Sequence, residues 1–177
     1  MNQTEFGVLR QTIAARGTVR IVIVPLTIAA WAAMTLAVLV LAQLPVAALL
    51  SLAVLAAGFE AVHALHVGVE RIGRYIQVFY EERGDEARWE TTAMQAGPGL
   101  PGGGVDPLFA VLFLSAAVIN LLPALLPEPT GPELAVVGAL HAAFVARVVA
   151  ARRAAARQRT VELDRYRDLL LRERDRQ

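Results

Sequence analysis

Four stretches of apolar residues dominate the chain, and each is about long enough to cross a lipid bilayer. A bilayer core about 30 Å thick needs about 20 apolar residues in a helix. The four stretches cover residues 21–43, 46–69, 107–126 and 134–151. Short turns that contain proline, at 44–45 and 127–133, follow the first and third stretches. The pattern predicts an all-α integral membrane protein, a four-transmembrane-helix bundle made of two hairpins.

The arginines predict the orientation of these helices, because all 17 positively charged residues are arginine. Three precede the first stretch, four lie between the second and third, and nine follow the fourth, whereas the turns at 44–45 and 127–133 contain none. Arginine-rich flanks stay in the cytoplasm. We therefore expect both termini and the central loop on the cytoplasmic side of the cytoplasmic (inner) membrane. The first stretch is longer than the apolar core of a cleaved signal peptide, so we expect it to remain as a span.

The second helix is expected to continue beyond the membrane into the cytoplasm. Apolar residues recur after residue 69 at the three- and four-residue spacings of a helix. They are Val69, Ile72, Ile76, Phe79 and Tyr80. We expect this helix to end near Gly84-Asp85. The segment 96–104, AGPGLPGGG, is too rich in Gly and Pro for regular structure, so we expect a loop there, and Asp106-Pro107 is expected to start the third span.

The fourth helix is expected to run on to about Arg174. Leu163, Tyr166 and Leu170 recur along one side of it. Residues 152–177 carry nine arginines and five acids, a net charge of +4, whereas 68–106 carry four arginines and seven acids, a net charge of −3. The two segments are therefore expected to pack together, or against a second copy of the chain.

These elements divide the chain into three parts. A cytoplasmic N-terminal segment, 1–20, precedes a transmembrane domain, 21–151, into which the cytoplasmic extension and loop 70–106 are inserted. A charged cytoplasmic helix, 152–177, follows. This arginine-rich tail could also lie on anionic lipid headgroups, but its interleaved acids argue against nucleic acid as a partner.

Glu60 and Arg147 are the two oppositely charged residues that the pattern places within the membrane. Counting 1.5 Å per residue from the outer ends of their helices places Glu60 at a depth of roughly 21 Å and Arg147 at roughly 20 Å. A charge within a span costs about 2.5–3.5 kcal/mol on insertion scales, so we predict that these two residues pair across the bundle. The alternative is that Arg147 reaches the cytoplasmic surface along its own stem while Glu60 is protonated.

A polar stripe runs along the second helix through Glu60. Its members share an arc of about 120°, at 100° per residue. They are Glu60, His63, His66, Glu70 and Arg74. Such a stripe is expected to face the bundle interior, a water-filled cavity or a partner rather than lipid. Three interpretations stay open: a satisfied polar core that fixes helix register, a proton or ion relay, and a metal site.

The metal interpretation depends on Glu60-x-x-His63, the spacing used in di-iron carboxylate bundles, with His66 and Glu70 as further ligands. One chain has one such motif, so a homodimer would have to complete a divalent-metal site. No other cofactor is expected. Asn120 and His141, which lie in the outer half of the membrane, are expected to hydrogen-bond each other between helices.

The composition excludes most soluble enzyme chemistry. The chain is 56% hydrophobic and 19% charged, whereas a soluble domain has about 45–50% apolar and about 25% charged residues. It contains no Cys and no Lys, which excludes thiolate chemistry, a Walker A loop and a Schiff base.

We therefore expect a small non-catalytic integral membrane protein that acts as an oligomeric or accessory subunit through its cytoplasmic helices. Its expected partners are the lipid bilayer and a second copy or another membrane protein. The alternatives are an ion or proton transport component, or a metal-binding membrane enzyme, built on the polar stripe.

Overall fold

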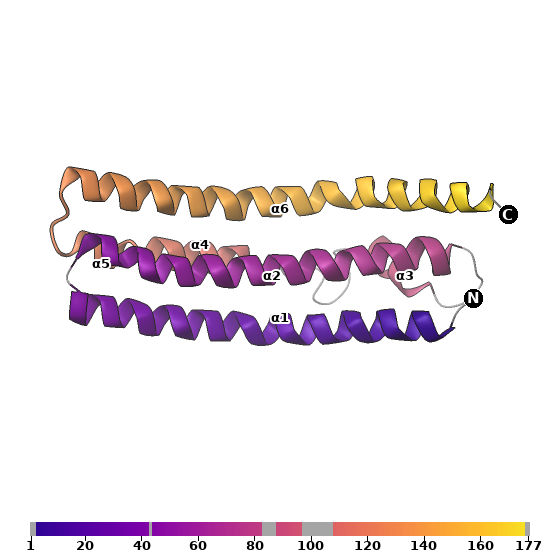
Figure 1. The fold of residues 1–177 in the computed structure, drawn as a ribbon, viewed down its shortest axis with the longest axis horizontal. Coiled ribbons are helices and arrows are strands. Elements are labelled where there is room, and N and C mark those ends of the chain that lie inside the picture. The colour runs from indigo at the N-terminus through magenta and orange to yellow at the C-terminus, as the bar shows by residue number, and fades with distance from the viewer. Residues whose placement is uncertain (1–2, 43, 83–87, 97–107, 176–177) are drawn as a thin grey trace. The chain divides into compact units, whose positions relative to one another are not determined.

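The computed structural model describes residues 3–42, 44–82, 88–96 and 108–175, which form helices and short turns, with no strand among them. Helices α1 (Gln3–Ala37) and α2 (Ala48–Ile76) each run into a π-helical turn, η1 (Val38–Ala42) and η3 (Gln77–Glu81). A short 3₁₀ helix, η2 (Pro45–Ala47), precedes α2. The remaining helices are α3 (Trp89–Ala96), α4 (Ala110–Ile119), α5 (Leu122–Leu125) and α6 (Gly131–Arg174) (Figure 1).

Three of the helical segments are long and apolar enough to cross a membrane. They cover Thr4–Ala42, Pro45–Glu81 and Gly131–Ala155. These segments confirm the prediction of an all-helical chain with apolar helices of membrane-spanning length. Helices α2 and α6 also continue beyond residues 69 and 151, and α6 ends at Arg174.

The third predicted span, 107–126, is where the structure differs from the expectation. Helices α4 and α5 together cover Ala110–Leu125, which is about 24 Å at 1.5 Å per residue. Helix α4 ends at Ile119, and a turn separates it from α5. Pro123 accounts for this break, because proline has no N–H to donate and its ring clashes with the carbonyl four residues earlier. Here that carbonyl belongs to Ile119, the last residue of α4.

The chain forms two compact units, each assembled from separate stretches of sequence. Unit 1 comprises Met1–Val19, Leu65–Val105 and Arg153–Gln177, and unit 2 comprises Arg20–Ala64 and Asp106–Arg152. The sequence placed the corresponding borders after residues 20, 69 and 151. The helix end expected at Gly84-Asp85, the loop expected from residue 97 to 104, and the helix start expected at Asp106-Pro107 lie outside the described residues.

Unit 2 has an apolar core centred on Phe59 of α2. The rings of Phe113 on α4 and Phe144 on α6 lie edge-on to it, at centroid separations of 5.4 and 6.1 Å. Edge-to-face aromatic pairs contribute about 0.5–1.5 kcal/mol beyond the area they bury. The buried α2 residues of this core recur at three- and four-residue intervals, at Leu52, Leu55, Phe59 and Val62. One side of α2 is thereby committed to contacts with α4 and α6.

A close contact between α1 and α2 is made at Gly58. A Cβ atom at this position would overlap the side chain of Thr27 on α1. Small residues allow membrane helices to approach this closely. Gly58 therefore sets the spacing of the first helical hairpin at this level.

Unit 1 is held in part by aromatic rings from α2, η3 and α6. Tyr75 stacks on Phe79 at a centroid separation of 4.6 Å, and Tyr166 of α6 meets both rings edge-on at 5.8 and 6.3 Å. Leu170, one turn further along α6, is buried. Tyr166 and Leu170 belong to the apolar side of the fourth helix that the sequence indicated. The extension of α6 thus packs against that of α2, which is the first of the two arrangements that the charges allowed.

Candidate functional site

Asn120 lies in the turn between α4 and α5 and is completely buried. Its Oδ1 accepts a hydrogen bond from Nε1 of Trp31 on α1 at 3.0 Å. Its Nδ2 donates to the carbonyl oxygen of Ala48, the first residue of α2, at 3.0 Å, and to Nε2 of His141 on α6 at 3.1 Å. The side-chain amide therefore engages its acceptor and both of its donor hydrogens. One residue links the turn to α1, α2 and α6.

His141 has a defined tautomer in this network. Its Nε2 faces an N–H of Asn120 and so accepts, while its Nδ1 lies 2.8 Å from the carbonyl oxygen of Val137 and so donates. A neutral imidazole with its hydrogen on Nδ1 satisfies both contacts. The sequence suggested a contact between Asn120 and His141, and the structure brings the two side chains together. The sequence did not indicate that Trp31 takes part, because an uncharged indole in an apolar segment does not stand out as a polar group.

Arg147 of α6 meets Glu60 of α2 in unit 2. Its Nη2 donates to Oε2 of Glu60 at 2.8 Å and lies 3.3 Å from Nδ1 of His63. A guanidinium has donors only, so Nδ1 of His63 accepts and its hydrogen is on Nε2. The side chains of Arg147 and Glu60 are 41% and 50% exposed. The two residues lie together as the sequence suggested, but at the surface of unit 2 rather than inside the bundle.

The polar stripe of α2 divides between the two units. Glu60 and His63 belong to unit 2, whereas His66, Glu70 and Arg74 belong to unit 1. Among the described residues, no group of three or more His, Asp or Glu side chains is placed to hold a metal ion. The ligands that the sequence offered therefore form no such cluster within the described part of one chain.

Glu162 of α6 is the centre of a polar network in unit 1. Its side chain, 12% exposed, accepts hydrogen bonds from Arg74, from Arg71 at 3.4 Å and from Gln158 at 2.7 Å. Arg74, which is buried, also donates to Glu70 at 3.1 Å. Sequence reasoning identified Glu70 and Arg74 but missed Glu162. The available signal was the four-residue spacing of Gln158 and Glu162, which places both on one side of α6.

Two partly buried glutamates of unit 1 have pKa values that are shifted in opposite directions. Burial alone raises the pKa of Glu162, but hydrogen bonds from Arg74 and Gln158 outweigh it and hold that pKa below its ordinary value. Burial raises the pKa of Glu90, although the charge of Arg10 at 3.3 Å acts against the rise. Glu162 is therefore held as a carboxylate, while Glu90 is more readily protonated than an exposed glutamate.

Glu81, the last residue of η3, caps helix α3. Its carboxylate accepts hydrogen bonds from the backbone N–H groups of Glu90 and Thr91, both at 2.8 Å, and from the Thr91 hydroxyl at 2.9 Å. The first N–H groups of a helix have no partner within it, and the helix dipole favours a negative charge there. Glu81 is 3% exposed. One buried side chain thus ties the eight-residue helix α3 to the end of η3.

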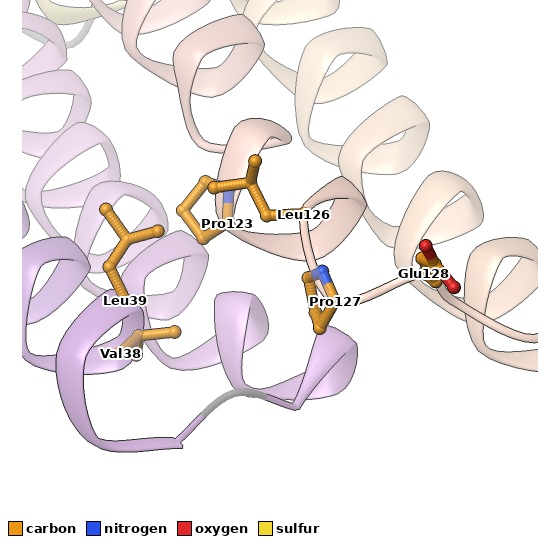
Figure 2. A pocket seen from close by; sticks show the side chains of 6 residues that line it. All are labelled: Val38, Leu39, Pro123, Leu126, Pro127 and Glu128. Atoms are coloured by element: carbon orange, nitrogen blue, oxygen red, sulfur yellow. The ribbon is translucent and has the colours of Figure 1, made fainter.

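A cavity of about 550 Å³ opens in unit 2 beside η1 and α5 (Figure 2). Its lining residues are Val38, Leu39, Pro123, Leu126, Pro127 and Glu128. The sequence placed none of its candidate site residues there. One carboxylate among apolar side chains is not a catalytic constellation, so the cavity adds no chemistry to the polar groups described above.

The described chain is an all-helical protein with three helices of membrane-spanning length. No protein family model, curated protein or solved structure matches it. Inference about its function therefore depends on the contacts of Asn120, of the Glu60–Arg147 pair and of Glu162.

We predict that Asn120→Leu lowers the free energy of unfolding by about 2 kcal/mol, because it removes three hydrogen bonds that average about 0.6 kcal/mol each in membrane proteins. Trp31→Phe removes one of the three and should lower it by about a third as much. Unfolding in mixed micelles titrated with a denaturing detergent measures both values. Equal losses in the two variants would show that Asn120 does not join the three helices.

We predict that the C-terminal part of α6 loosens as the pH falls below about 4.5, the ordinary range for glutamate. The folded-state pKa of Glu162 lies below its unfolded value. Its stabilising contribution is therefore complete above the unfolded pKa and is lost as the pH falls through the folded pKa. Hydrogen exchange of residues 158–175, corrected for intrinsic rates, should rise in acid more in the wild type than in Glu162→Gln.

Hydrogen exchange at neutral pH gives a second test of Glu162. Glu162→Gln leaves the buried Arg74 with a weaker partner and should raise exchange roughly tenfold or more. Glu173→Gln, at an exposed position on the same helix, is the matched control and should change exchange by less than about twofold on the same argument. Because the raised pKa of Glu90 acts in the opposite direction, the difference between wild type and variant is the informative quantity. If hydrogen exchange rises in acid as much in Glu162→Gln as in the wild type, the loosening of α6 is caused by a group other than Glu162.

Proposed function

We propose that this protein is a non-catalytic integral membrane protein that serves as an oligomeric or accessory subunit through its cytoplasmic helices. Unit 1 is the observation that carries the proposal. Parts of α1, α2 and α6 form it together with α3, and these stretches lie outside the uncharged apolar cores of the spans. A folded helical unit of this kind offers a binding surface for a partner, whereas a lipid anchor alone would not need one.

The contacts of the polar residues support a structural role. Glu162, Glu81, Asn120 and His141 are each engaged by protein groups. Catalysis requires a nucleophile or base that is free to meet a substrate, together with groups that stabilise developing charge. Of the candidate residues, the Glu60–Arg147 pair, the adjacent His63 and Glu70 retain access to the surroundings. This exposure is what favours the second candidate, an ion or proton transport component.

We also propose that the chain crosses the cytoplasmic membrane four times, with both termini in the cytoplasm. The arginine distribution supports this orientation, and the nine arginines after residue 151 would also suit contact with anionic headgroups. The segment from α4 to α5 would make the third crossing. Its helical length of about 24 Å is shorter than a typical bilayer core, and local thinning of the bilayer accommodates such a mismatch at modest cost.

Single cysteines test this topology without background, because the chain has no Cys of its own. We predict that a membrane-impermeant maleimide labels Leu44→Cys and Thr130→Cys in right-side-out vesicles. Arg88→Cys and Asp168→Cys should react only after the membrane is opened. If the segment from α4 to α5 does not cross, Thr130→Cys will match Arg88→Cys and Asp168→Cys will become accessible from outside. That pattern would replace four spans by three.

Native mass spectrometry tests the subunit role. The full chain is extracted from its own membrane, with the surrounding lipid, in native nanodiscs. We predict assemblies heavier than the single chain of 19.0 kDa. Tyr166→Ala removes the edge contacts with Tyr75 and Phe79 and should reduce the assembled fraction by about half or more, since aromatic pairs of this kind contribute measurably to packing. Asp168→Asn, exposed on the same helix, should leave it unchanged. A wild-type chain that is found alone would contradict the proposal.

The alternatives predict different results on the same preparations. A metal-binding enzyme would retain a divalent metal in the wild type and lose it in His63→Ala. A transport component would carry protons or ions into liposomes and stop doing so in Glu60→Gln. Neither result is expected of a non-catalytic subunit.

A further inference from the structure

Most of the exposed side chains of unit 2 are apolar, and the Glu60–Arg147 pair is the charged exception on α2 and α6. Helix α1 exposes bulky apolar side chains, among them Ile21, Val22, Leu26 and Leu36. Helix α4 does the same with Val111, Leu112, Val118 and Ile119. Side chains of this size and polarity match lipid tails, and nothing drives one such surface against another in a bilayer.

The exposed surface of α2 and α6 near the Glu60–Arg147 pair carries alanines beside two bulky side chains of α6, Val136 and Leu140. On α2, Ala53, Ala57 and Ala64 are exposed with Glu60, within an arc of about 60° at 100° per residue. On the part of α6 that belongs to unit 2, the exposed alanines within about 80° of Arg147 are Ala139, Ala143 and Ala150. We call these eight residues the α2–α6 face. Small residues are what transmembrane helices present where another helix packs against them.

The charges on the α2–α6 face require a polar neighbour. The contact between Glu60 and Arg147 involves one carboxylate oxygen and one guanidinium nitrogen, and a guanidinium carries five N–H donors in all. Both side chains are about half exposed. Groups of this charge are costly against lipid tails and in membrane proteins pair with one another. A partner that covers the face must therefore supply an acid opposite Arg147 and a base opposite Glu60.

We propose that a second copy of this chain docks on the α2–α6 face, an inference that rests on the subunit role proposed above. Glu60 and Arg147 lie side by side, with 2.8 Å between Oε2 and Nη2. A two-fold rotation about the membrane normal keeps depth but reverses the lateral order, so Glu60 of each copy faces Arg147 of the partner subunit. The face is thus self-complementary, as a two-fold interface has to be. The four side chains form a ring of alternating charge, and the alanines allow the helices to approach.

Two charge reversals test this arrangement. Glu60→Arg gives a face with two positive charges, and Arg147→Glu gives a face with two negative charges. Each variant alone should self-associate at least about tenfold more weakly than the wild type, since like charges meet across the interface. When the two variants are mixed in liposomes, every cross-interface contact becomes attractive again, and energy transfer between differently labelled copies should return to the wild-type level. A pair that acts only within one chain cannot be repaired by mixing.

Cysteine crosslinking tests the same face with both charges intact. Ala57 lies one turn outward of Glu60, and Ala143 lies one turn outward of Arg147, so the two meet at the same depth across the proposed interface. Copies carrying Ala57→Cys should crosslink to copies carrying Ala143→Cys. Leu26→Cys, on the exposed side of α1, is the control and should not crosslink to either variant. This measurement stands even if a charge-reversed variant fails to fold.

The outcomes separate this inference from the subunit role. Crosslinking through Leu26→Cys in place of Ala57→Cys would overturn docking on the α2–α6 face but leave an oligomer. If one copy of the chain is found bound to a different protein, the partner on the α2–α6 face is not a second copy. The accessory role would then remain. A single chain with no bound protein would overturn both proposals.

Discussion

The hydrogen bonds of Asn120 are the constraint on which the rest of unit 2 depends. Apolar helix surfaces in a bilayer have no hydrophobic drive to meet in one particular way, so polar groups decide which faces are joined. Asn120 bonds Trp31, the Ala48 carbonyl and His141 at once. An amide whose acceptor and both donor hydrogens are engaged restricts the rotation of each neighbouring helix. The break between α4 and α5 is what brings this side chain to the meeting point.

The two units use polar groups in different ways. Inside unit 2 the network around Asn120 is neutral, and the charged pair lies at the surface. Unit 1 instead buries Arg74 and most of Glu162, and each has several partners: Arg74 meets two carboxylates, and Glu162 meets three donors. A buried charge is tolerated when it is paired and hydrogen-bonded, and two carboxylates offset the one buried donor of Arg74, its Nε, that has no hydrogen-bond partner among the described residues. The difference follows from the surroundings expected of each unit, apolar for one and aqueous for the other.

Features that depend on position along a helix could be predicted from the sequence, and features that depend on rotation between helices could not. Segment length predicted α1, α2 and α6, and counting residues by depth suggested that Glu60 and Arg147 meet. The third apolar stretch contains Pro123, but the sequence predicted one continuous span there and not a turn between two short helices. The partner of Arg74, Glu162, lies 88 residues away, and no periodicity within one helix shows which side faces another. The cap that Glu81 makes on α3 could not be predicted either, because it depends on how η3 and α3 are placed relative to each other.

The buried network also decides where the charged pair lies. His141 and Arg147 are six residues apart on α6, or about 240° around the helix, so turning His141 inward toward Asn120 directs Arg147 to another side. The bond from Asn120 to the Ala48 carbonyl holds the first turn of α2 beside the same amide. With both helices held by one amide, Glu60 and Arg147 meet at a shared edge and remain half exposed. A partner that binds there contacts side chains positioned from within unit 2, and this gives an interface in lipid the register that apolar surfaces such as that of α1 lack.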